Sequence, residues 1–405
     1  MSKMVEVTIP IGPQHPALKE PEYFTLKVDG ETIVDVDVRL GYAHRGIEKA
    51  AESRDYIQNI YLIERVCGIC SHSHTTAFVQ GVEELMHLEV PKRGLYIRTL
   101  VGELERVHSH LLWVGVAGHE VGFDTLFMYA WRDREIVQDI LEMISGNRVN
   151  YAMNTIGGVR RDISDAQIST ILRGVKKLEE RTKYYLKVAT SESTFLARAS
   201  GVGYLRKEVA KQLCAVGPTA RGSGVDIDAR RDDKYAAYGE IPFEVITTDM
   251  CDVLGRAYVR VMETVESCKM IKYMLEHLPS GPYIAEKSPS KVPPKVPTGE
   301  VVSYYEAPRG EDIHYIKSNG TNKPERVKIR APTLANFTSI AECLKGGNIA
   351  DVPLVIAAID PCMSCTDRMI VADVNEWTKK VVTMDELRKL GNCRNSKVNT
   401  MNSKR

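Results

Sequence analysis

The stretch Arg65-Val66-Cys67-Gly68-Ile69-Cys70-Ser71-His72-Ser73-His74 has a distant counterpart in Asp360-Pro361-Cys362-Met363-Ser364-Cys365. Each stretch contains a Cys-x-x-Cys pair, in which two intervening residues let the chain turn so that both sulfurs face one point. Two such pairs offer four thiolates. Thiolates are the soft ligands that select zinc, copper(I), iron-sulfur clusters, nickel or iron over hard cations. The two pairs therefore predict a four-thiolate metal site.

The separation of the two pairs indicates what kind of site they form. A zinc ribbon places its second pair roughly 15 to 20 residues after the first. Here the interval from Cys70 to Cys362 is 362 minus 70, or 292 positions. We therefore expect the pairs to come from opposite ends of one folded body and to meet only when it folds. The alternative, that each pair consists of two small buried hydrophobic residues, is less easily reconciled with the charged residues and the Pro or Gly beside each pair.

The residues around the cysteines carry a family resemblance. Arg-x-Cys-Gly-x-Cys-x-x-x-His, from Arg65 to His74, and Asp-Pro-Cys-x-x-Cys, from Asp360 to Cys365, are similar to the paired signatures of nickel-iron hydrogenase large subunits. The resemblance covers nearly the whole chain. Further matching motifs are Gly12-Pro13-Gln14-His15-Pro16, His44-Arg45-Gly46-Ile47-Glu48, Gly217-Pro218-Thr219-Ala220-Arg221-Gly222-Ser223-Gly224 and Glu306-Ala307-Pro308-Arg309-Gly310.

Two of the motifs indicate a branch within that family. Gly-Pro-x-His-Pro near the start, and Cys365-Thr366-Asp367-Arg368 after the second pair, resemble the energy-converting, membrane-associated branch. This branch is related to the quinone-site subunit of respiratory complex I, which has lost its cysteines. Because the present chain keeps all four, the resemblance favours hydrogen chemistry over quinone chemistry.

The composition excludes several classes of function. The chain has 405 residues, with 54 Lys and Arg against 53 Asp and Glu, so its net charge of +1 does not attract nucleic acid or anionic lipid. No apolar run reaches the roughly 18 to 20 residues of a membrane span. The first residues lack the apolar core of a secretory signal, which predicts a cytoplasmic protein. Nine cysteines, an odd number, fit a reducing compartment with metal-binding thiols.

The patterning predicts an α+β fold, with a long-helix bundle as the core and small antiparallel β elements at the N- and C-terminal ends. Strands at 23–28 and 32–38 flank Asp29-Gly30, a strong hairpin signal. Ser164 is expected to cap a helix. The long helices are expected at 94–116, 125–144, 164–188 and 246–278. Toward the C-terminus we expect strands at 301–306, 312–317 and 326–329, a helix at 333–344 and a buried strand at 352–359.

Domain boundaries follow from these elements. We expect an N-terminal β-hairpin region at 1–45, and a helical bundle with the first Cys-x-x-Cys at 46–280. A β/α region with the second Cys-x-x-Cys is expected at 281–368, followed by a C-terminal extension at 369–405. The residues after the first cysteine pair read as a helix, so its thiolates are expected near a helix N-terminus, where the helix dipole favours anionic sulfur.

The resemblance implies roles for the cysteines and their neighbours. It implies that Cys67 and Cys362 bind nickel terminally, and that Cys70 and Cys365 bridge nickel to an iron carrying CO and cyanide. His74 would form a hydrogen bond with a bridging sulfur and so tune the metal. The alternative without a functional role for His74 is an ordinary core histidine.

Arg309 matches the family arginine poised over the metals, and Asp360 would be its counter-charge. A guanidinium is always charged, and burying one without a partner would be costly. The alternative without a functional role for Arg309 is a surface arginine. Glu48, in the His44 to Glu48 motif, resembles the ligand of a structural magnesium, although a glutamate on a helix surface would look the same.

The proton route is the point at which the chain departs from the family pattern. The usual Arg-x-Glu-Gly-His loop is absent, and the segment 12–22 occupies its place. We favour Glu20 as the proton-transferring carboxyl, with Glu22 and His15 left open. A carboxyl beside a dry metal site has a raised pKa, which suits it to relaying protons near neutral pH. The alternative for Glu20 is a solvated loop acid.

The resemblance also implies processing and partners. Large subunits of this type are often made with an extension that a nickel-dependent endopeptidase removes, here between Arg368 and Met369. Because no spare clustered cysteines remain for an electron wire, we expect an iron-sulfur small subunit and, through it, further iron-sulfur and membrane subunits. The substrates would be H2 and protons, and the carrier ferredoxin or another low-potential donor. The chain would lie at the cytoplasmic side of the cell membrane as a peripheral subunit.

Two other functions remain open. The first is a complex-I-like quinone or sulfur-reducing subunit that retains its cysteines, which the Gly12 to Pro16 motif supports. The second is a zinc-stapled interaction protein without catalysis, which metal analysis giving only zinc would favour.

Overall fold

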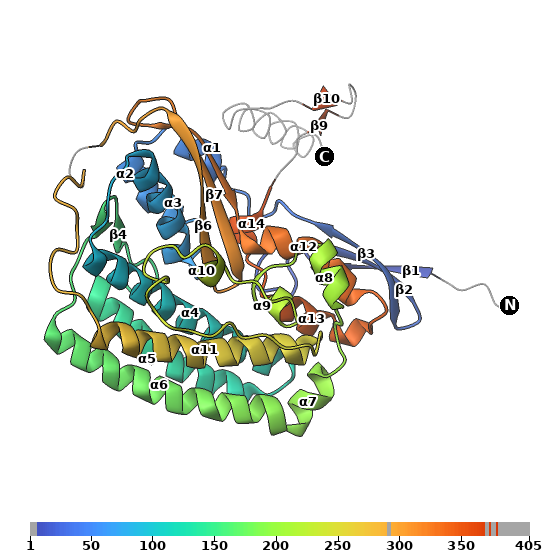
Figure 1. The fold of residues 1–405 in the computed structure, drawn as a ribbon. Coiled ribbons are helices and arrows are strands. Elements are labelled where there is room, and N and C mark those ends of the chain that lie inside the picture. Colours follow the sequence, from blue (N-terminus) through green and yellow to red (C-terminus); the bar gives the residue numbers. More distant parts are fainter. Residues whose placement is uncertain (1–5, 290–292, 369–371, 374–377, 380–405) are drawn as a thin grey trace, which may run out of the picture.

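The computed structural model describes residues 6–289, 293–368, 372–373 and 378–379, and long helices form its core (Figure 1). Helix α4 packs against α5 and α11, and α6 packs against the same two helices. The prediction of long helices is confirmed for all of these segments. The helices are α4 Lys92–Glu120, α5 Asp124–Ser145, α6 Asp165–Ser191 and α11 Val253–Glu276.

Capping residues set where these helices begin. Ser164 is the N-cap of α6, as predicted, and it forms a reciprocal capping box with Gln167. Helix α11 begins later than the predicted position 246. Asp252 is its N-cap, and the Asp252 carboxylate accepts a hydrogen bond of 2.8 Å from the backbone N–H of Gly255. Residues 246–251, predicted as helix, therefore lie outside it.

The N-terminal strands form an antiparallel sheet in the order β1-β2-β3. They are β1 Glu6–Ile11, β2 Tyr23–Asp29 and β3 Thr32–Arg39. Along β2 the side chains of Phe24, Leu26 and Val28 alternate toward the core, which is the period expected of a half-buried strand. The hairpin at Asp29-Gly30 is confirmed. The connection from β1 to β2 is the loop that carries Glu20.

A second antiparallel sheet, in the order β6-β7-β8, follows the helical region. Its strands are β6 Gly299–Ala307, β7 Gly310–Ser318 and β8 Pro324–Arg330. Helix α3 Ser71–Leu85 packs against β6 and β7, so blue and orange segments lie side by side in Figure 1. The turn between β6 and β7 presents Arg309. Gly310 has φ +126°, and a Cβ there would lie 2.7 Å from the backbone nitrogen of Gly217, so this close approach requires glycine.

The buried strand predicted at 352–359 is wrong, because these residues form helix α13 Val352–Ile359. A short apolar run buried on all sides has no periodicity that separates a strand from a helix. Pro353 fits the first turn of a helix, and Asp360 ends it in the left-handed conformation with φ +59°. The preceding helix, predicted at 333–344, is confirmed as α12 Pro332–Leu344.

Shorter elements connect these parts and confirm the α+β class. The helices are α1 Ile47–Ala51, α2 Tyr56–Glu64, α7 Ser193–Ala199, α8 Lys207–Gln212, α9 Gly217–Arg221, α10 Ala229–Asp232, the 3-10 turn Ile349–Asp351 and α14 Met363–Thr366. The strands are β4 Asn154–Thr155, β5 Gly158–Val159, β9 Ala372–Asp373 and β10 Thr378–Lys379.

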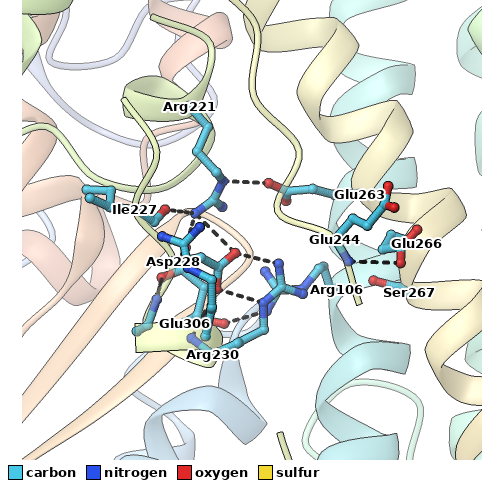
Figure 2. A network of polar contacts seen from close by, with 12 residues as sticks. Arg106, Arg221, Ile227, Asp228, Arg230, Glu244, Glu263, Glu266, Ser267 and Glu306 are labelled. Atoms are coloured by element: carbon cyan, nitrogen blue, oxygen red, sulfur yellow. Dashed lines mark hydrogen bonds and ion pairs between the residues drawn. The ribbon is translucent and has the colours of Figure 1, made fainter. Parts of the chain in front are cut away.

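Buried charged residues join the bundle to the second sheet (Figure 2). Arg221 of α9 pairs with Glu263 of α11 and with Glu306 of β6, each at 2.8 Å. Arg106 of α4 donates a hydrogen bond of 2.6 Å to the carbonyl of Glu306. We call the set Glu103, Arg106, Arg221, Asp228, Arg230, Glu263 and Glu306 the buried ion network. Because Glu306 lies three residues before Arg309, the network also fixes the turn that carries Arg309.

Within the described ranges, none of the helices combines the length and the apolar character that crossing a membrane requires.

Candidate metal centre

The structure brings the two Cys-x-x-Cys pairs together. The Sγ atoms of Cys67 and Cys362 lie 3.3 Å apart, and with the sulfur of Cys365 they form a group in which all the atoms lie within 4.8 Å of one another. The four cysteines, Cys70 included, are at most 4% exposed. A metal ion with bonds of ~2.3 Å to sulfur can join sulfurs up to about 4.6 Å apart. This donor set is soft, buried and convergent, and it fits a thiolate-bound metal centre.

The first pair lies at the beginning of α3, as predicted. Cys67 Sγ accepts hydrogen bonds of 3.3 Å from the backbone N–H groups of Ile69 and Cys70, which curl the loop around this sulfur. Cys70 occupies the N-cap position, but its side chain makes no capping hydrogen bond. The helix dipole therefore points its positive end toward the cysteines.

Glu105 of α4 supplies the missing cap, a role that the sequence analysis did not assign. Its carboxylate accepts hydrogen bonds from the backbone N–H groups of His72, at 2.6 Å, and Ser73, at 3.0 Å. Burial raises the pKa of Glu105 to about 7, against hydrogen bonds from Ser73 and His72 that lower it. In the sequence, the only indication of this role is a glutamate among the apolar residues of α4.

The second pair is held by contacts from distant segments. The backbone N–H of Cys362 donates to Thr333 Oγ1 at 3.1 Å, next to the start of α12. Arg45 donates to the carbonyls of Arg65, at 2.9 Å, Val66, at 2.6 Å, and Ser364, at 2.9 Å. One guanidinium therefore connects the chain before the first cysteine pair to the chain within the second.

The thiols influence one another. A hydrogen bond with Cys362 lowers the pKa of Cys67, and one with Cys365 lowers the pKa of Cys362. The hydrogen bonds with Cys362 raise the pKa values of Cys70 and Cys365. Four thiolates this close repel one another, so a cation among them would be strongly favoured.

Arg309 and Asp360 form a buried pair beside the cysteines, as the sequence analysis expected of them. The guanidinium donates to Asp360 Oδ1 at 2.7 Å and to the Asp360 carbonyl at 2.8 Å. It also donates to Ser109 Oγ at 3.2 Å. Arg309 is only 2% exposed, so the charge is compensated and oriented inside the protein rather than solvated.

Among the three candidates for proton transfer, the structure places Glu20 against the second cysteine pair. Its carboxylate accepts hydrogen bonds from the backbone N–H groups of Met363 and Ser364 at the start of α14. Burial, followed by the neighbouring Cys362, raises the pKa of Glu20 to about 7. Glu22 is buried, and burial together with Glu20 raises its pKa to about 8. His15 is exposed on the same loop.

His74 lies between the cysteines and the second sheet. One of its ring nitrogens is within 4.8 Å of the sulfurs of Cys70 and Cys365. Its Nδ1 lies 2.8 Å from Asp312 Oδ2 and 3.1 Å from His314 Nε2. Asp312 and His314 were not singled out from the sequence. Their positions two residues apart on a strand, which place both side chains on one face, are the signal that could have identified them.

Glu48 lies in surroundings that do not suit magnesium. Its carboxylate contacts Lys328 at 3.0 Å and Arg368 at 3.1 Å, and it accepts a hydrogen bond from the backbone N–H of Ile329. In the described part of the chain, no group of three potential ligand atoms includes Glu48. Lys328 and Arg368 compensate the Glu48 carboxylate in this structure, and the magnesium ligand stays a prediction. The processing point after Arg368 cannot be described, because Met369 lies outside the described residues.

Family models match most of this chain. The model described as "Respiratory-chain NADH dehydrogenase, 49 Kd subunit" matches residues 120–368, and the one described as "Nickel-dependent hydrogenase" matches residues 45–115. The membrane-bound hydrogenase subunit alpha of Pyrococcus furiosus is 44% identical over 97% of this chain and 94% of its own length. The chain belongs to the nickel-iron hydrogenase large-subunit family, in the membrane-associated branch related to complex I.

Other members of this hydrogenase and complex I family show how widely it extends. Formate hydrogenlyase subunit 5 of Escherichia coli is 40% identical over 94% of this chain and 66% of its own length. A chain in the structure of the membrane-bound sulfane sulfur reductase, an archaeal respiratory membrane complex, is 33% identical with a TM-score of 0.86. That match covers 91% of this chain and 100% of the other. The hydrogenase of Pyrococcus furiosus and the sulfane sulfur reductase are both named as membrane-bound.

Proposed function

We propose that this chain is the catalytic subunit of a membrane-associated nickel-iron hydrogenase, which cleaves and forms H2 heterolytically. The observation that supports it most is the convergence of four buried cysteines beside the Arg309 and Asp360 pair. Glu20 adds a carboxyl that contacts the backbone of the second cysteine pair. A soft metal site, a buried cation and a neighbouring proton carrier are what heterolytic chemistry on H2 needs.

The four cysteines would hold the metals. In this proposal Cys67 and Cys362 would hold nickel, and Cys70 and Cys365 would hold nickel together with an iron that carries CO and cyanide. When bound, such a centre supplies the Lewis acidity that polarises H2 and the redox capacity for its two electrons. The loop and helix contacts described above hold the sulfurs in place, so little reorganisation is needed.

Arg309 and Asp360 would act on charge near the metals. The two hydrogen bonds to Asp360 fix the plane of the guanidinium, and the bond to Ser109 fixes its remaining edge. A guanidinium held in this way can bind cyanide on iron and stabilise charge that develops as H2 is split. Asp360 is the positioning partner, since it also compensates the buried charge.

Glu20 would receive and return the proton. Its carboxylate is held by backbone N–H groups of α14, next to Cys362 and Cys365, so it reaches the second cysteine pair without a large movement. A pKa of about 7 lets it exchange protons near neutral pH. Glu22 lies two residues further along the loop and is the natural next carrier toward the rest of the protein.

Electrons would leave through a partner. Among the cysteines of the described residues, Cys214 is exposed and Cys251, Cys268 and Cys343 are buried, and none joins the others in a metal-ligand group. We therefore propose an iron-sulfur small subunit, reached from ferredoxin or another low-potential carrier, and membrane subunits beyond it. The chain would sit peripherally at the cytoplasmic side. Cleavage after Arg368 by a maturation endopeptidase belongs to the same proposal.

A second candidate function is a quinone or sulfur-reducing subunit. It is favoured by the family match to the 49-kDa subunit and by the similarity to a chain of a sulfane sulfur reductase complex. The two candidates differ in what the cysteines do. A hydrogenase needs nickel and iron at the four sulfurs, whereas sulfur or quinone reduction does not require that pair.

The deciding experiment uses the complex purified from its own cells under anaerobic conditions. Nickel and iron are measured by elemental analysis, and H2-dependent reduction of a viologen dye is measured on the same sample. We expect about one nickel per chain and dye reduction with H2. Sulfur- or quinone-dependent turnover in a sample without nickel would favour the second candidate. Zinc as the only metal, with neither activity, would indicate a structural site.

A further inference from the structure

A buried cluster of ligand atoms lies behind the cysteines, between α3 and β7. It consists of His74, Asp312 and His314, all of which are inaccessible to solvent. Along β7 every second residue faces the core, and Asp312 and His314 occupy two of those buried positions. A buried carboxylate and imidazole cost free energy unless they are well partnered. The question is therefore what partners them.

The three ligand atoms form a nearly equilateral triangle. His74 Nδ1 is 2.8 Å from Asp312 Oδ2, His314 Nε2 is 3.2 Å from the same oxygen, and the two nitrogens are 3.1 Å apart. Hydrogen bonds from two histidines to one aspartate ordinarily form a chain, His to Asp to His, with the nitrogens well separated. In this cluster the two nitrogens converge on each other as closely as they do on the oxygen.

His74 Nδ1 and His314 Nε2 form a hydrogen bond of 3.1 Å with each other, but within the described residues the other polar side-chain atoms of the cluster have no such partner. Among the described residues, neither oxygen of Asp312 has a hydrogen-bond partner with suitable geometry, and the same holds for His74 Nε2 and His314 Nδ1. Buried carboxylates in folded proteins are almost always bonded, so this one requires an explanation. A carboxylate oxygen that lies 2.8 and 3.2 Å from two ring nitrogens without accepting a hydrogen bond is expected when an ion normally occupies the centre.

We propose that His74, Asp312 and His314 bind a divalent first-row transition-metal ion, at a site separate from the four thiolates. Two imidazole nitrogens and one carboxylate oxygen form the facial ligand set that such ions accept. With bonds of ~2.1 Å and octahedral angles, adjacent ligand atoms lie about 3.0 Å apart, which the three observed distances match. Asp312 Oδ1 is free to provide a fourth ligand atom.

The position of the site gives it a structural and electrostatic role. His74 belongs to α3, which begins beside Cys70, while the other two ligands belong to the second sheet. An ion would therefore tie the helix behind the first cysteine pair to the strand that follows Arg309. It would bind His74 through Nδ1 and leave Nε2 as the nitrogen able to face the sulfurs. The alternative occupant of the triangle is a proton shared among the three side chains.

The test removes the thiolates while keeping the cluster. The full chain carrying Cys67→Ser, Cys70→Ser, Cys362→Ser and Cys365→Ser is titrated with Co2+, followed by Zn2+ for X-ray absorption. We expect one Co2+ per chain, with visible ligand-field absorption and no thiolate charge-transfer bands. The zinc sample should show imidazole and oxygen ligands without sulfur. This result does not depend on hydrogenase activity, so it can fail while the proposed function stands.

Single variants then assign the ion to the cluster. Asp312→Asn and His314→Gln should each weaken Co2+ binding by more than about 100-fold, since loss of a ligand exceeds the 10- to 100-fold effect of outer-shell changes. His119→Gln is the matched control, because His119 forms an exposed pair with Asp124 at 2.9 Å and should leave binding unchanged. No bound Co2+, or equal binding in Asp312→Asn, would overturn the proposal in favour of a shared proton.

A second comparison covers the case in which the serine variant does not fold. The chain with its native cysteines and its Asp312→Asn variant are both depleted of metal and reloaded with Zn2+. We expect the variant to hold one zinc fewer, with its sulfur coordination unchanged in X-ray absorption and its circular dichroism spectrum intact. Equal zinc content in the two proteins would contradict the proposal independently of the first experiment.

Discussion

The sulfur of Cys67 lies 3.3 Å from that of Cys362, although the two cysteines are 295 positions apart in the sequence. This contact joins the loop before α3 to the segment before α14, and both cysteines are buried. The proposed metal centre depends on it, since neither pair alone offers four sulfurs. The roles proposed for Arg309, Glu20 and His74 all depend on where this contact places the sulfurs.

Replacing Cys67 by serine should remove the metal. A serine hydroxyl is a hard and weakly acidic donor, so it replaces a thiolate poorly as a ligand of nickel. We expect the nickel content of the Cys67→Ser complex to fall to background and H2-dependent dye reduction to disappear. Cys214→Ser is the control, because Cys214 is exposed and belongs to no ligand group among the described residues. A nickel content unchanged in Cys67→Ser would rule out this cysteine as a ligand.

Glu20→Gln should separate proton transfer from metal binding. Glutamine keeps an oxygen that can accept the hydrogen bonds of Met363 and Ser364, but it cannot carry a proton. We expect dye reduction with H2 to fall by at least about 100-fold, the contribution typical of a positioned acid or base. Nickel content should remain at the level of the unaltered protein.

Lys19→Gln is the matched control for Glu20, since Lys19 is the preceding residue and pairs with Glu120 instead. It should change activity by less than a factor of a few. Full activity in Glu20→Gln would transfer the role to Glu22, and Glu22→Gln would then be the next variant to measure.

Stability should depend on pH through Glu105. Its pKa is about 7 in the folded protein, against 4.5 for an ordinary glutamate, so the folded state binds the proton more tightly. The contribution of this group is complete below pH 4.5 and is lost as the pH rises through 7. The loss amounts to up to about 3 kcal/mol. The urea midpoint of the isolated chain should therefore fall more between pH 5 and pH 8 than that of Glu105→Gln.

The comparison requires a control for general pH effects. Glu84→Gln changes an exposed glutamate of α3, and its urea midpoint should follow the unaltered protein at every pH. If Glu105→Gln showed the same pH slope as the unaltered protein, the carboxyl would not be the group responsible. Glutamine also replaces one of the two oxygens that accept from the N–H groups of His72 and Ser73, so Glu105→Gln should lose part of the cap of α3.

The buried ion network should be sensitive to loss of one charge. Glu263 pairs with Arg221 at 2.8 Å inside the protein (Figure 2), and with His110 at 2.9 Å. Glu263→Gln leaves the buried guanidinium with less compensation, and we expect a loss of about 3 kcal/mol of unfolding free energy. Glu276→Gln changes an exposed glutamate in the last turn of α11 and should cost less than about 1 kcal/mol. Similar losses in both variants would argue against a special role for the network.

The elements with clear local signals could be predicted from the sequence. The apolar spacing predicted the long helices. Ser164 predicted the start of α6, and Asp29-Gly30 predicted the first hairpin. The two cysteine pairs predicted that they would lie together, because a four-thiolate site needs the sulfurs of both pairs. The prediction of a strand at 352–359 was wrong, because a short buried apolar run has no periodicity that separates a strand from a helix.

The residues that contact the cysteines and His74 could not be predicted, because tertiary packing determines which side chains meet. Glu105 caps α3 only because α4 lies against its first turn. Asp312 and His314 meet His74 only because α3 packs on β7, and neither strand nor helix alone contains that information. Arg45 was visible within a motif, but its contacts to three carbonyls from two distant segments were not.

The most direct test of the proposed centre is an infrared spectrum of the complex purified anaerobically from its own cells. Iron-bound CO and cyanide absorb at frequencies where protein groups do not. We predict bands of both ligands, and we expect them to be missing from the Cys67→Ser complex prepared in the same way. A metal-loaded complex without CO and cyanide bands would contradict the assignment of a nickel-iron centre to these four cysteines.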